Sequence, residues 1–408
     1  MNILFLTHYF PPEGNAPASR TFEHARRWVE SGASVTVITS NPNVPHGQLY
    51  SGYRNRLKQI EFLDGIRVIR VWTYLAANAG NIRRTLNYLS FMISAVAAGI
   101  TSPRPNVIVA TSPQFFCGWA GVILSRLLRI PFVLEIRDIW PDSIAAVGAI
   151  NHKLPLLFLS KLEQSMYRAS DDIVTVGNGY RDTLIQRGVP KNKIRVIPNG
   201  ADLDRFKPGI PMPLNHKKSA NPHLFTCVYV GTIGMASRLD LIIKVATLFQ
   251  VQNDDRFHFY IVGDGSDRDR LQLESENLKL RNVTFTGLVK KSEIPNYIDR
   301  ADACIVHLRK DPLFETVLPS KLFEAMAMAK PIILGVQGAA ADLLQEAKAG
   351  IPITPEDSKG LLKALRKLQE SPFFCQQLGE AGREFVCKEY NRDHFANVYL
   401  ARILEKYR

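Results

Sequence analysis

The sequence predicts an α/β protein made of two doubly wound domains, each built around a mostly parallel sheet. The chain has 408 residues, and a single hydrophobic core stops growing at about 250–300 residues, so two domains are expected. Short runs rich in Val and Ile alternate with helix-period stretches in both halves, which is typical of βαβ units. A stretch rich in proline near the middle of the chain separates the halves.

Apolar runs predict the strands of both halves. In the first half these runs are residues 3–7, 34–39, 66–71, 107–110, 132–136 and 173–176. In the second half they are residues 226–230, 257–262, 283–286, 303–307, 331–334 and 350–353. Helical periodicity covers 20–30, 115–128, 239–249, 268–278, 294–300, 321–328 and 359–368.

The boundary between the halves is expected near residues 199–222. The Asn199-Gly200 turn signal is followed by Pro208, Pro211, Pro213 and Pro222, a composition typical of a linker. We therefore expect an N-terminal domain at 1–203, a C-terminal domain at 204–390 and a final helix at 391–408.

Charge is distributed unevenly along the chain. Residues 1–200 hold 22 Lys and Arg against 12 Asp and Glu, whereas residues 201–408 hold 29 against 26. A basic first half favours an anionic partner, either nucleic acid or a lipid surface. No nucleic-acid recognition motif is present, so we expect the membrane surface. Arg83, Arg84, Arg126 and Arg129 flank apolar stretches at 86–100 and 115–128, which fit either an interfacial face or ordinary core helices.

Cysteine spacing and apolar run length indicate the compartment. The five cysteines form no C-x-x-C pair, so neither a disulfide framework nor a thiolate zinc site is expected. The N-terminus lacks a basic region and a cleavage pattern, so we expect no signal peptide. The longest uncharged apolar stretch, 86–101, is too short to span a bilayer. These features predict a protein of a reduced compartment without a transmembrane segment.

Two loops of the first half carry candidate chemistry. The loop after the first predicted strand contains Gly14, Asn15 and Arg20, and could present backbone N–H groups and a guanidinium to a phosphate. An ordinary strand-to-helix turn is the alternative. Arg137 and Asp138 follow the strand at 132–136, where buried charges need partners. They either form structural ion pairs or face a ligand.

The second half carries two glycine loops and a cationic helix start. Gly231 and Thr232 follow one predicted strand and lead to Arg238, whose guanidinium is a candidate partner for a diphosphate. Gly263 follows the next predicted strand, in a glycine sequence that is common in turns.

Pro319 is expected at the first helical position, which places Lys321 in the first turn. A cation there opposes the helix dipole unless an anion lies nearby. Glu324, on the same face, could accept hydrogen bonds from a ribose. The alternative is a solvated Lys321–Glu324 pair.

The ordered set of motifs resembles the retaining family-4 glycosyltransferases of the GT-B fold, and is most like bacterial enzymes of O-antigen, capsule and colanic-acid assembly. The motifs are FPPEGNAPASR, RDIWPDS, VIPNGAD, YVGTIG, IVGDG and LPSKLFEAMAMAKPI, with Pro355-Glu356-Asp357 beyond them. The resemblance implies two Rossmann-like domains facing a central cleft. The first would bind the acceptor and the second the nucleotide sugar, with a C-terminal helix crossing back to the first. It implies no metal and no cofactor, in keeping with the absence of a D-x-D pattern.

The resemblance and the loops together define the expected site residues. The catalytic residues would be Asp138, Arg238 and Lys321. The acceptor-binding residues would be Asn15, Arg20, Arg137 and Asp138. The donor-binding residues would be Gly14, Gly231, Thr232, Gly263, Val289, Thr316, Pro319, Ser320, Lys321 and Glu324.

The chain departs from the family pattern at two places. Thr316 stands where the first glutamate of the E-x7-E pair would fall, and Glu315 is off register by one. Thr232 and Ser237 stand near the positions of the family's Arg and Lys. Arg238 and Lys321 are then the expected substitutes for leaving-group charge.

The expected activity is sugar transfer with retention of anomeric configuration. The PSK-x-x-E form implies a UDP-linked N-acetylated or deoxy hexose as donor. An undecaprenyl-diphosphate-linked saccharide would be the acceptor, and the protein would lie on the inner face of the cytoplasmic membrane, with no nucleic-acid partner. The alternatives are a sugar-nucleotide epimerase of the same fold, or a non-catalytic module that binds a nucleotide sugar or membrane. A dehydrogenase is disfavoured because G-x-G-x-x-G is absent.

Overall fold

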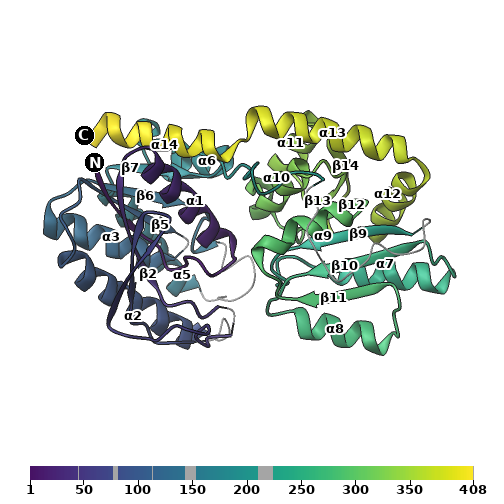
Figure 1. Ribbon diagram of the computed structural model, residues 1–408, viewed down its shortest axis with the longest axis horizontal. Coiled ribbons are helices and arrows are strands. Elements are labelled where there is room, and N and C mark those ends of the chain that lie inside the picture. Colours follow the sequence, from purple (N-terminus) through teal and green to yellow (C-terminus); the bar gives the residue numbers. More distant parts are fainter. Residues whose placement is uncertain (45, 77–80, 113, 143–152, 210–223, 408) are drawn as a thin grey trace. The chain divides into compact units, whose positions relative to one another are not determined.

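A computed structural model describes residues 1–44, 46–76, 81–112, 114–142, 153–209 and 224–407. The chain forms two compact units (Figure 1). The first contains Met1–Asn199 together with Asp393–Arg408, and the second contains Gly200–Arg392. The expected limits at 203/204 and 390/391 lie a few residues from these. Most of the boundary region expected near residues 199–222, from residue 210 onward, falls outside the described residues.

The first unit is built on an eight-stranded sheet of order β3-β4-β2-β1-β5-β6-β7-β8. The neighbouring strands run parallel except β3 and β4, which form an antiparallel pair. The strands are β1 (Asn2–Leu6), β2 (Ser34–Ser40), β3 (Lys58–Leu63), β4 (Ile66–Val71), β5 (Val107–Ser112), β6 (Phe132–Ile136), β7 (Asp172–Thr175) and β8 (Ile194–Val196).

Helices cover both faces of this sheet (Figure 1). They are α1 (Ala16–Glu30), α2 (Asn81–Ile100), α3 (Phe115–Leu128), α5 (Lys153–Ala169), α6 (Asn178–Gln186) and α14 (Arg392–Tyr407), with a 3-10 turn at η1 (Lys191–Lys193). On the α1 face, Trp28 stacks on Phe5 of β1 and meets Tyr399 of α14 edge-on, with ring centroids 5.5 and 5.1 Å apart. The final helix therefore completes the core of the first unit.

The second unit has a six-stranded parallel sheet of order β11-β10-β9-β12-β13-β14. Its strands are β9 (Phe225–Val230), β10 (Phe257–Val262), β11 (Val283–Gly287), β12 (Ala303–His307), β13 (Ile332–Gly335) and β14 (Gly350–Pro352). Its helices are α7 (Asp240–Val251), α8 (Arg268–Asn277), α9 (Ile294–Arg300), α10 (Ser320–Ala327), α11 (Ala339–Glu346), α12 (Ser358–Glu370) and α13 (Pro372–Glu389), and its 3-10 turns are η2 (Lys291–Glu293) and η3 (Pro312–Thr316).

Two hydrophobic cores lie on opposite faces of the second sheet. One contains residues of α9, α10, α11 and α13, and the other is formed mainly by α7, α8 and α12. Because successive β9 side chains point to opposite faces, Val228 belongs to the first core and Tyr229 to the second. The doubly wound architecture expected from the sequence is confirmed in both units.

The structure adds elements that the apolar runs did not indicate. The edge strand β3 alternates exposed and half-buried residues, and its Phe62 is exposed, so it has no continuous apolar run.

The expectation that Pro319 occupies the first helical position is wrong. Pro319 has extended φ and ψ of −64° and 131° and is the N-cap, and α10 begins at Ser320.

Candidate functional site

The candidate site lies at the carboxyl end of the second sheet, where the direction of winding reverses. Strand β9 lies between β10 and β12, so its two neighbours are reached by crossovers in opposite directions. Ligands of open α/β sheets bind in the crevice that forms at such a point. The loop after β9 and the loop from β12 to α10 both start here.

Lys321 of α10 reaches over the end of β9. Its Nζ donates a hydrogen bond to the hydroxyl of Tyr229 at 2.6 Å, and lies 3.9 Å from the centroid of the Tyr229 ring. Gly231 leaves room for this approach, because a Cβ at that position would lie 2.9 Å from Lys321 Nζ. The lysine thus comes from the face covered by α10 and meets a tyrosine whose ring lies in the opposite core.

The Tyr229 hydroxyl is part of a closed hydrogen-bond network. It lies 2.8 Å from the carbonyl oxygen of Thr232 and 2.9 Å from Ser237 Oγ. Ser237 Oγ in turn donates to the Thr232 carbonyl at 2.9 Å. Ser237 and the Tyr229 ring are both buried, so the network holds the loop after β9 in one shape.

Arg238 ends this loop beside two carboxylates. Its guanidinium lies 3.5 Å from Asp240 and 3.4 Å from Glu356, and its side chain is 41% exposed. Its backbone has φ of 46°, in the left-handed region. Lys321 differs, because no carboxylate of the described residues lies within ion-pair distance of its Nζ. Lys321 is therefore the less neutralised of the two expected cations.

His307, the last residue of β12, braces two of the loops at the site. Its Nδ1 lies 2.8 Å from the carbonyl oxygen of Ser237, and its Nε2 accepts the backbone N–H of Glu356 at 2.9 Å. These partners require the neutral tautomer with the proton on Nδ1. Burial lowers the pKa of His307 below its ordinary value, which favours the same neutral form.

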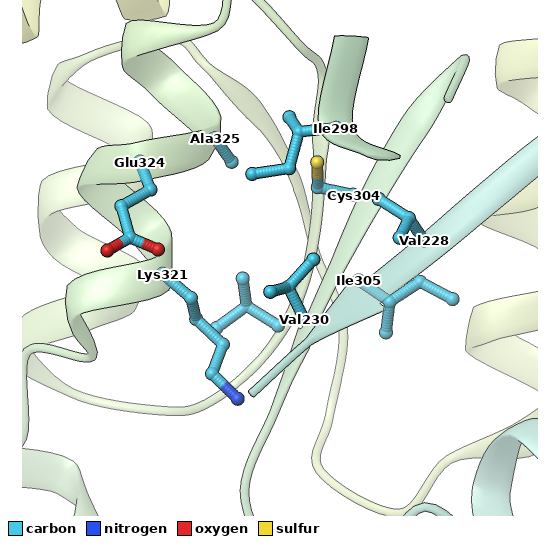
Figure 2. A pocket seen from close by; sticks show the side chains of 9 residues that line it. Val228, Val230, Ile298, Cys304, Ile305, Lys321, Glu324 and Ala325 are labelled. Atoms are coloured by element: carbon cyan, nitrogen blue, oxygen red, sulfur yellow. The ribbon is translucent and has the colours of Figure 1, made fainter. Parts of the chain in front are cut away.

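The start of α10 contributes backbone donors. Pro319 has no side chain that caps the helix, so the first N–H groups, at Ser320 and Lys321, have no side-chain cap among the described residues. Helix N-termini of this kind favour anions. Figure 2 shows Lys321 and Glu324 on this helix beside the pocket, with their side chains extending in different directions. The pocket, of ≈ 10 Å³, has room for about one water and is lined mainly by apolar side chains together with Lys321 and Glu324.

The other expected donor residues lie around these loops. Gly263 follows β10 with φ of 136°, and a Cβ there would lie 2.0 Å from the Gly231 carbonyl oxygen. Thr316 ends η3 and donates its hydroxyl to the Leu313 carbonyl at 3.0 Å. Val289, after β11, is half-buried against the α10 core. Thr316 is half-buried and Glu315 exposed, so neither side chain is fixed by burial.

The site residues that we expected in the first unit have structural partners. Asn15 is the N-cap of α1 and accepts the Ala18 N–H at 2.9 Å, and Gly14 beside it is exposed. Arg137 donates to the Pro17 carbonyl at 3.2 Å. Asp138 is half-buried, and its negative charge contributes to raising the pKa of Tyr180, after the larger effect of burial. These contacts leave the acceptor roles of Asn15, Arg137 and Asp138 as predictions.

Arg20 requires a correction. Its side chain is 2% exposed and pairs with the buried carboxylate of Glu135 at 3.1 Å. The remaining guanidinium nitrogens donate to the carbonyls of Ile197 and Pro198, each at 2.9 Å. The expected contact of Arg20 with a phosphate or acceptor does not fit these partners. Arg137 also lies within ion-pair distance of Glu135, at 3.9 Å, but Arg20 is the closer partner of that carboxylate.

Sequence reasoning missed Tyr229, His307 and the role of Glu356. Tyr229 is the penultimate residue of β9, two positions before Gly231, and His307 is the last residue of β12, whereas Glu356 lies in the loop after β14. A polar side chain near the carboxyl end of an otherwise apolar strand was the signal that could have found Tyr229 and His307, and it does not extend to Glu356. Among the described residues, no group of three or more His, Cys, Asp or Glu could hold a metal ion.

The fold and this site define a class of enzyme, and comparison with known proteins identifies it. Residues 15–200 match the glycosyl transferase 4-like domain, and residues 213–385 match glycosyl transferases group 1. The chain is therefore a glycosyltransferase of the GT-B fold, with a 4-like domain followed by a group 1 domain.

Its relatives include a glycosyl transferase of colanic acid biosynthesis and a mannosyltransferase. WcaI of Escherichia coli K12, named a colanic acid biosynthesis glycosyl transferase, is 25% identical over 391 residues, covering 90% of this chain and 92% of WcaI. The GDP-mannose-dependent alpha-mannosyltransferase of Mycobacterium tuberculosis is 22% identical over 356 residues, which cover 86% of this chain and 83% of the mannosyltransferase.

Solved structures share the fold at low identity. Sucrose-phosphate synthase from Thermosynechococcus elongatus has a TM-score of 0.74 at 16% identity, covering 100% of this chain and 98% of its own. Anabaena HepE in complex with UDP and glucose has a TM-score of 0.69 at 17% identity, covering 100% of both chains.

Proposed function

We propose that this glycosyltransferase moves an N-acetylated or deoxy hexose from a UDP-sugar to an undecaprenyl-diphosphate-linked saccharide, with retention of anomeric configuration, in surface polysaccharide assembly. The observation that carries the proposal is the Lys321 ammonium. It lies at the carboxyl end of β9, above Gly231, and among the described residues it has a hydroxyl rather than a carboxylate as its partner. A cation held in this way is suited to an anionic ligand.

The chemistry needs positive charge where the diphosphate departs. Cleavage of the glycosidic C–O bond puts negative charge on the leaving phosphate oxygen, and Lys321 and Arg238 would stabilise it together with the first N–H groups of α10. Such preorganised donors act most strongly on charge that develops in the transition state. Glu324 would accept hydrogen bonds from the ribose hydroxyls. Loss of Lys321 should lower turnover by roughly 10²–10³-fold, by analogy with oxyanion donors.

Similar proteins of known structure support UDP as the donor nucleotide, whereas one relative uses a different nucleotide. HepE was crystallised with UDP and glucose, and with UDP-glucose, whereas the mycobacterial relative is GDP-mannose-dependent. The PSK-x-x-E form at Pro319–Glu324 is the feature of this chain that favours UDP. We propose that the reaction needs neither metal nor cofactor, because the cations Lys321 and Arg238 would carry the compensating charge.

The first unit would recognise the acceptor. Asp138 would orient the acceptor hydroxyl, and Arg137 and Asn15 would line its path. An acceptor on a lipid diphosphate places the enzyme at the inner face of the cytoplasmic membrane. No helix in the described part of the chain is long and apolar enough to cross a bilayer, so the proposal is peripheral binding.

Exposed apolar side chains beside cations support that peripheral binding. On α2, Ile82 and Ile93 are 79% and 61% exposed, and Arg83 lies next to Ile82. On α5, Leu154 and Phe158 are 81% and 62% exposed. Basic residues beside apolar ones suit interfacial binding to anionic lipid. Vesicles with anionic lipid should therefore co-sediment the protein, and the double substitution Ile82→Ser with Ile93→Ser should weaken that binding. Equal sedimentation with neutral and anionic vesicles would contradict it.

The experiment that tests the function is a donor panel. The protein is incubated with UDP- and GDP-sugars, with EDTA present, with and without lipid-linked acceptor, and nucleotide release and the sugar nucleotide itself are followed. We expect UDP release that needs both one sugar and the acceptor, and that Lys321→Ala abolishes. Lys244→Ala, which removes an exposed lysine of α7, is the matched control. Epimerised donor without acceptor would favour the epimerase, and UDP binding without turnover would favour the non-catalytic module.

A further inference from the structure

We infer that Tyr229 is a positioning residue for Lys321, and that its hydroxyl holds the ammonium where the diphosphate leaves. This inference rests on the proposed function, because it assigns Lys321 its transition-state role. It starts from the one hydrogen bond that the lysine amine makes within the described part of the chain, the 2.6 Å bond to Tyr229.

The donors and acceptors around the Tyr229 hydroxyl make its oxygen the acceptor of the hydrogen bond from Lys321. A tyrosine hydroxyl has one proton to donate and lone pairs to accept with. The proton goes to one of two nearby acceptors, the Thr232 carbonyl oxygen at 2.8 Å or Ser237 Oγ at 2.9 Å. In both cases the phenol oxygen keeps a lone pair for Lys321. The network therefore fixes the tyrosine oxygen toward the ammonium.

Burial makes this oxygen a rigid reference point. The Tyr229 side chain is 1% exposed and lies in the core formed by α7, α8 and α12, while Lys321 is a half-buried residue on a helix of the opposite face. A lysine side chain has many rotamers, and one hydrogen bond from its amine to a buried tyrosine selects among them. The ammonium keeps two further N–H donors, which are available to phosphate oxygens.

Gly231 links this arrangement to the ligand path. Its absent side chain leaves the space through which Lys321 crosses the strand end, because a Cβ would stand 3.2 Å from Lys321 Cε as well as 2.9 Å from Nζ. The amine is thereby placed at the switch point rather than beside Glu324 on its own helix. Tyr229 itself touches no substrate in this scheme.

The test is a double-mutant cycle with Tyr229→Phe and Lys321→Ala. Tyr229→Phe keeps the ring and removes the oxygen, and a hydrogen bond to a charged group is worth enough to lower kcat by roughly 10–100-fold. Since Tyr229 acts through Lys321, the double variant should be no slower than Lys321→Ala alone. Tyr260→Phe on the neighbouring strand β10, whose side chain packs toward the other core, is the matched control and should keep wild-type kcat.

The possible outcomes distinguish failure of the positioning role of Tyr229 from failure of the proposed glycosyltransferase function. Wild-type turnover in Tyr229→Phe would overturn the positioning role and leave the transferase intact. Additive losses in the double variant would also overturn it, because a merely structural tyrosine damages the enzyme independently of Lys321. Absence of nucleotide release from every donor by folded wild-type protein would overturn the proposed function itself. An unfolding midpoint of Tyr229→Phe close to that of Tyr260→Phe, together with the kcat loss, supports positioning over folding.

Discussion

The Nε2 atom of His307 lies 2.9 Å from the backbone nitrogen of Glu356 and accepts its hydrogen, so that a buried ring ties the loop after β14 to the end of β12. Through Nδ1 the same ring also holds the Ser237 carbonyl. The loop that carries Arg238 and the loop that carries its partner Glu356 are therefore both held by one neutral histidine.

Replacing His307 by Phe should cost the second unit about 1–3 kcal/mol of stability. The substitution keeps a ring but leaves the buried Ser237 carbonyl without its partner, and an unsatisfied buried group costs about 1–3 kcal/mol. The N–H of Glu356, an exposed residue, also loses its partner. Chemical denaturation measures the loss. His258→Phe is the control, because His258 is half-buried and bonds only the Thr284 hydroxyl among the described residues. Equal losses in the two variants would contradict the bracing role.

The same histidine gives the second unit a pH dependence. Burial lowers the pKa of His307 in the folded protein, so the unfolded chain binds the proton more tightly. Its contribution to stability is therefore fully present above the unfolded pKa of about 6.5 and is lost as the pH falls below that value. The stability gap between wild type and His307→Phe should shrink from pH 7.5 to pH 5.5. A gap that stays constant would show that His307 does not titrate in this range.

Gly263→Ala should disrupt the glycine loops and Gly234→Ala should not. A Cβ at Gly263 would stand 2.0 Å from the Gly231 carbonyl oxygen at φ of 136°, whereas a Cβ at Gly234 meets nothing closer than 3.8 Å. A backbone clash in a disfavoured conformation should cost at least about 3 kcal/mol. Unfolding midpoints and UDP release of the two variants are compared. A Gly263→Ala protein with wild-type values in both would refute the close approach of these loops.

Breaking the Arg20–Glu135 pair should destabilise the first unit severely. Arg20→Met leaves the Glu135 carboxylate buried without its close partner, and such losses are about 3–5 kcal/mol. Arg181→Met, which removes an exposed pair with Asp182, should cost less than about 1 kcal/mol. Denaturant titration distinguishes the two. A small effect of Arg20→Met would mean that the guanidinium is free to serve a ligand, as first expected from the sequence.

Glu13 should make the first unit less stable at alkaline pH. Burial raises its pKa from 4.5 to about 7, although its carboxylate accepts the backbone N–H groups of Asn43 and Val44. The folded chain binds the proton more tightly, so this contribution is present below pH 4.5 and is lost as the pH rises through 7. Glu13→Gln should therefore gain up to about 3 kcal/mol over wild type at pH 8 and much less at pH 5. Thermal unfolding at both values checks this, and a gain independent of pH would refute it.

The sequence was informative where one physical signal dominated. Strands such as β5 and β10 are apolar runs ended by turn residues, so their place and the doubly wound order could be predicted. The sequence singled out Lys321 as a candidate site residue because a lysine in the first turn conflicts with the helix dipole, and its catalytic role stays a prediction. The strand β3 could not be predicted, because a half-exposed edge strand has no apolar run.

Side-chain partners were beyond the reach of the sequence. Arg20 and Glu135 are separated by 115 positions, and the chain around each carries nothing that shows they meet. Tyr229 and Lys321 are 92 positions apart and come from opposite faces of one sheet. Which cation is structural and which stays available for a ligand is decided by such contacts. Arg20 and Lys321 therefore looked equivalent until the fold was known.

The helix α14 has a consequence for how the protein is made. Arg27 of α1 pairs with Asp393, and the Trp28 indole donates to the Ala396 carbonyl at 2.9 Å, so the first unit needs residues that follow the whole of the second. A ribosome must translate residues 200–392 before these partners exist. Domains usually fold in the order of synthesis, yet here we expect the N-terminal unit to complete its core around Trp28 only after the C-terminal segment has emerged.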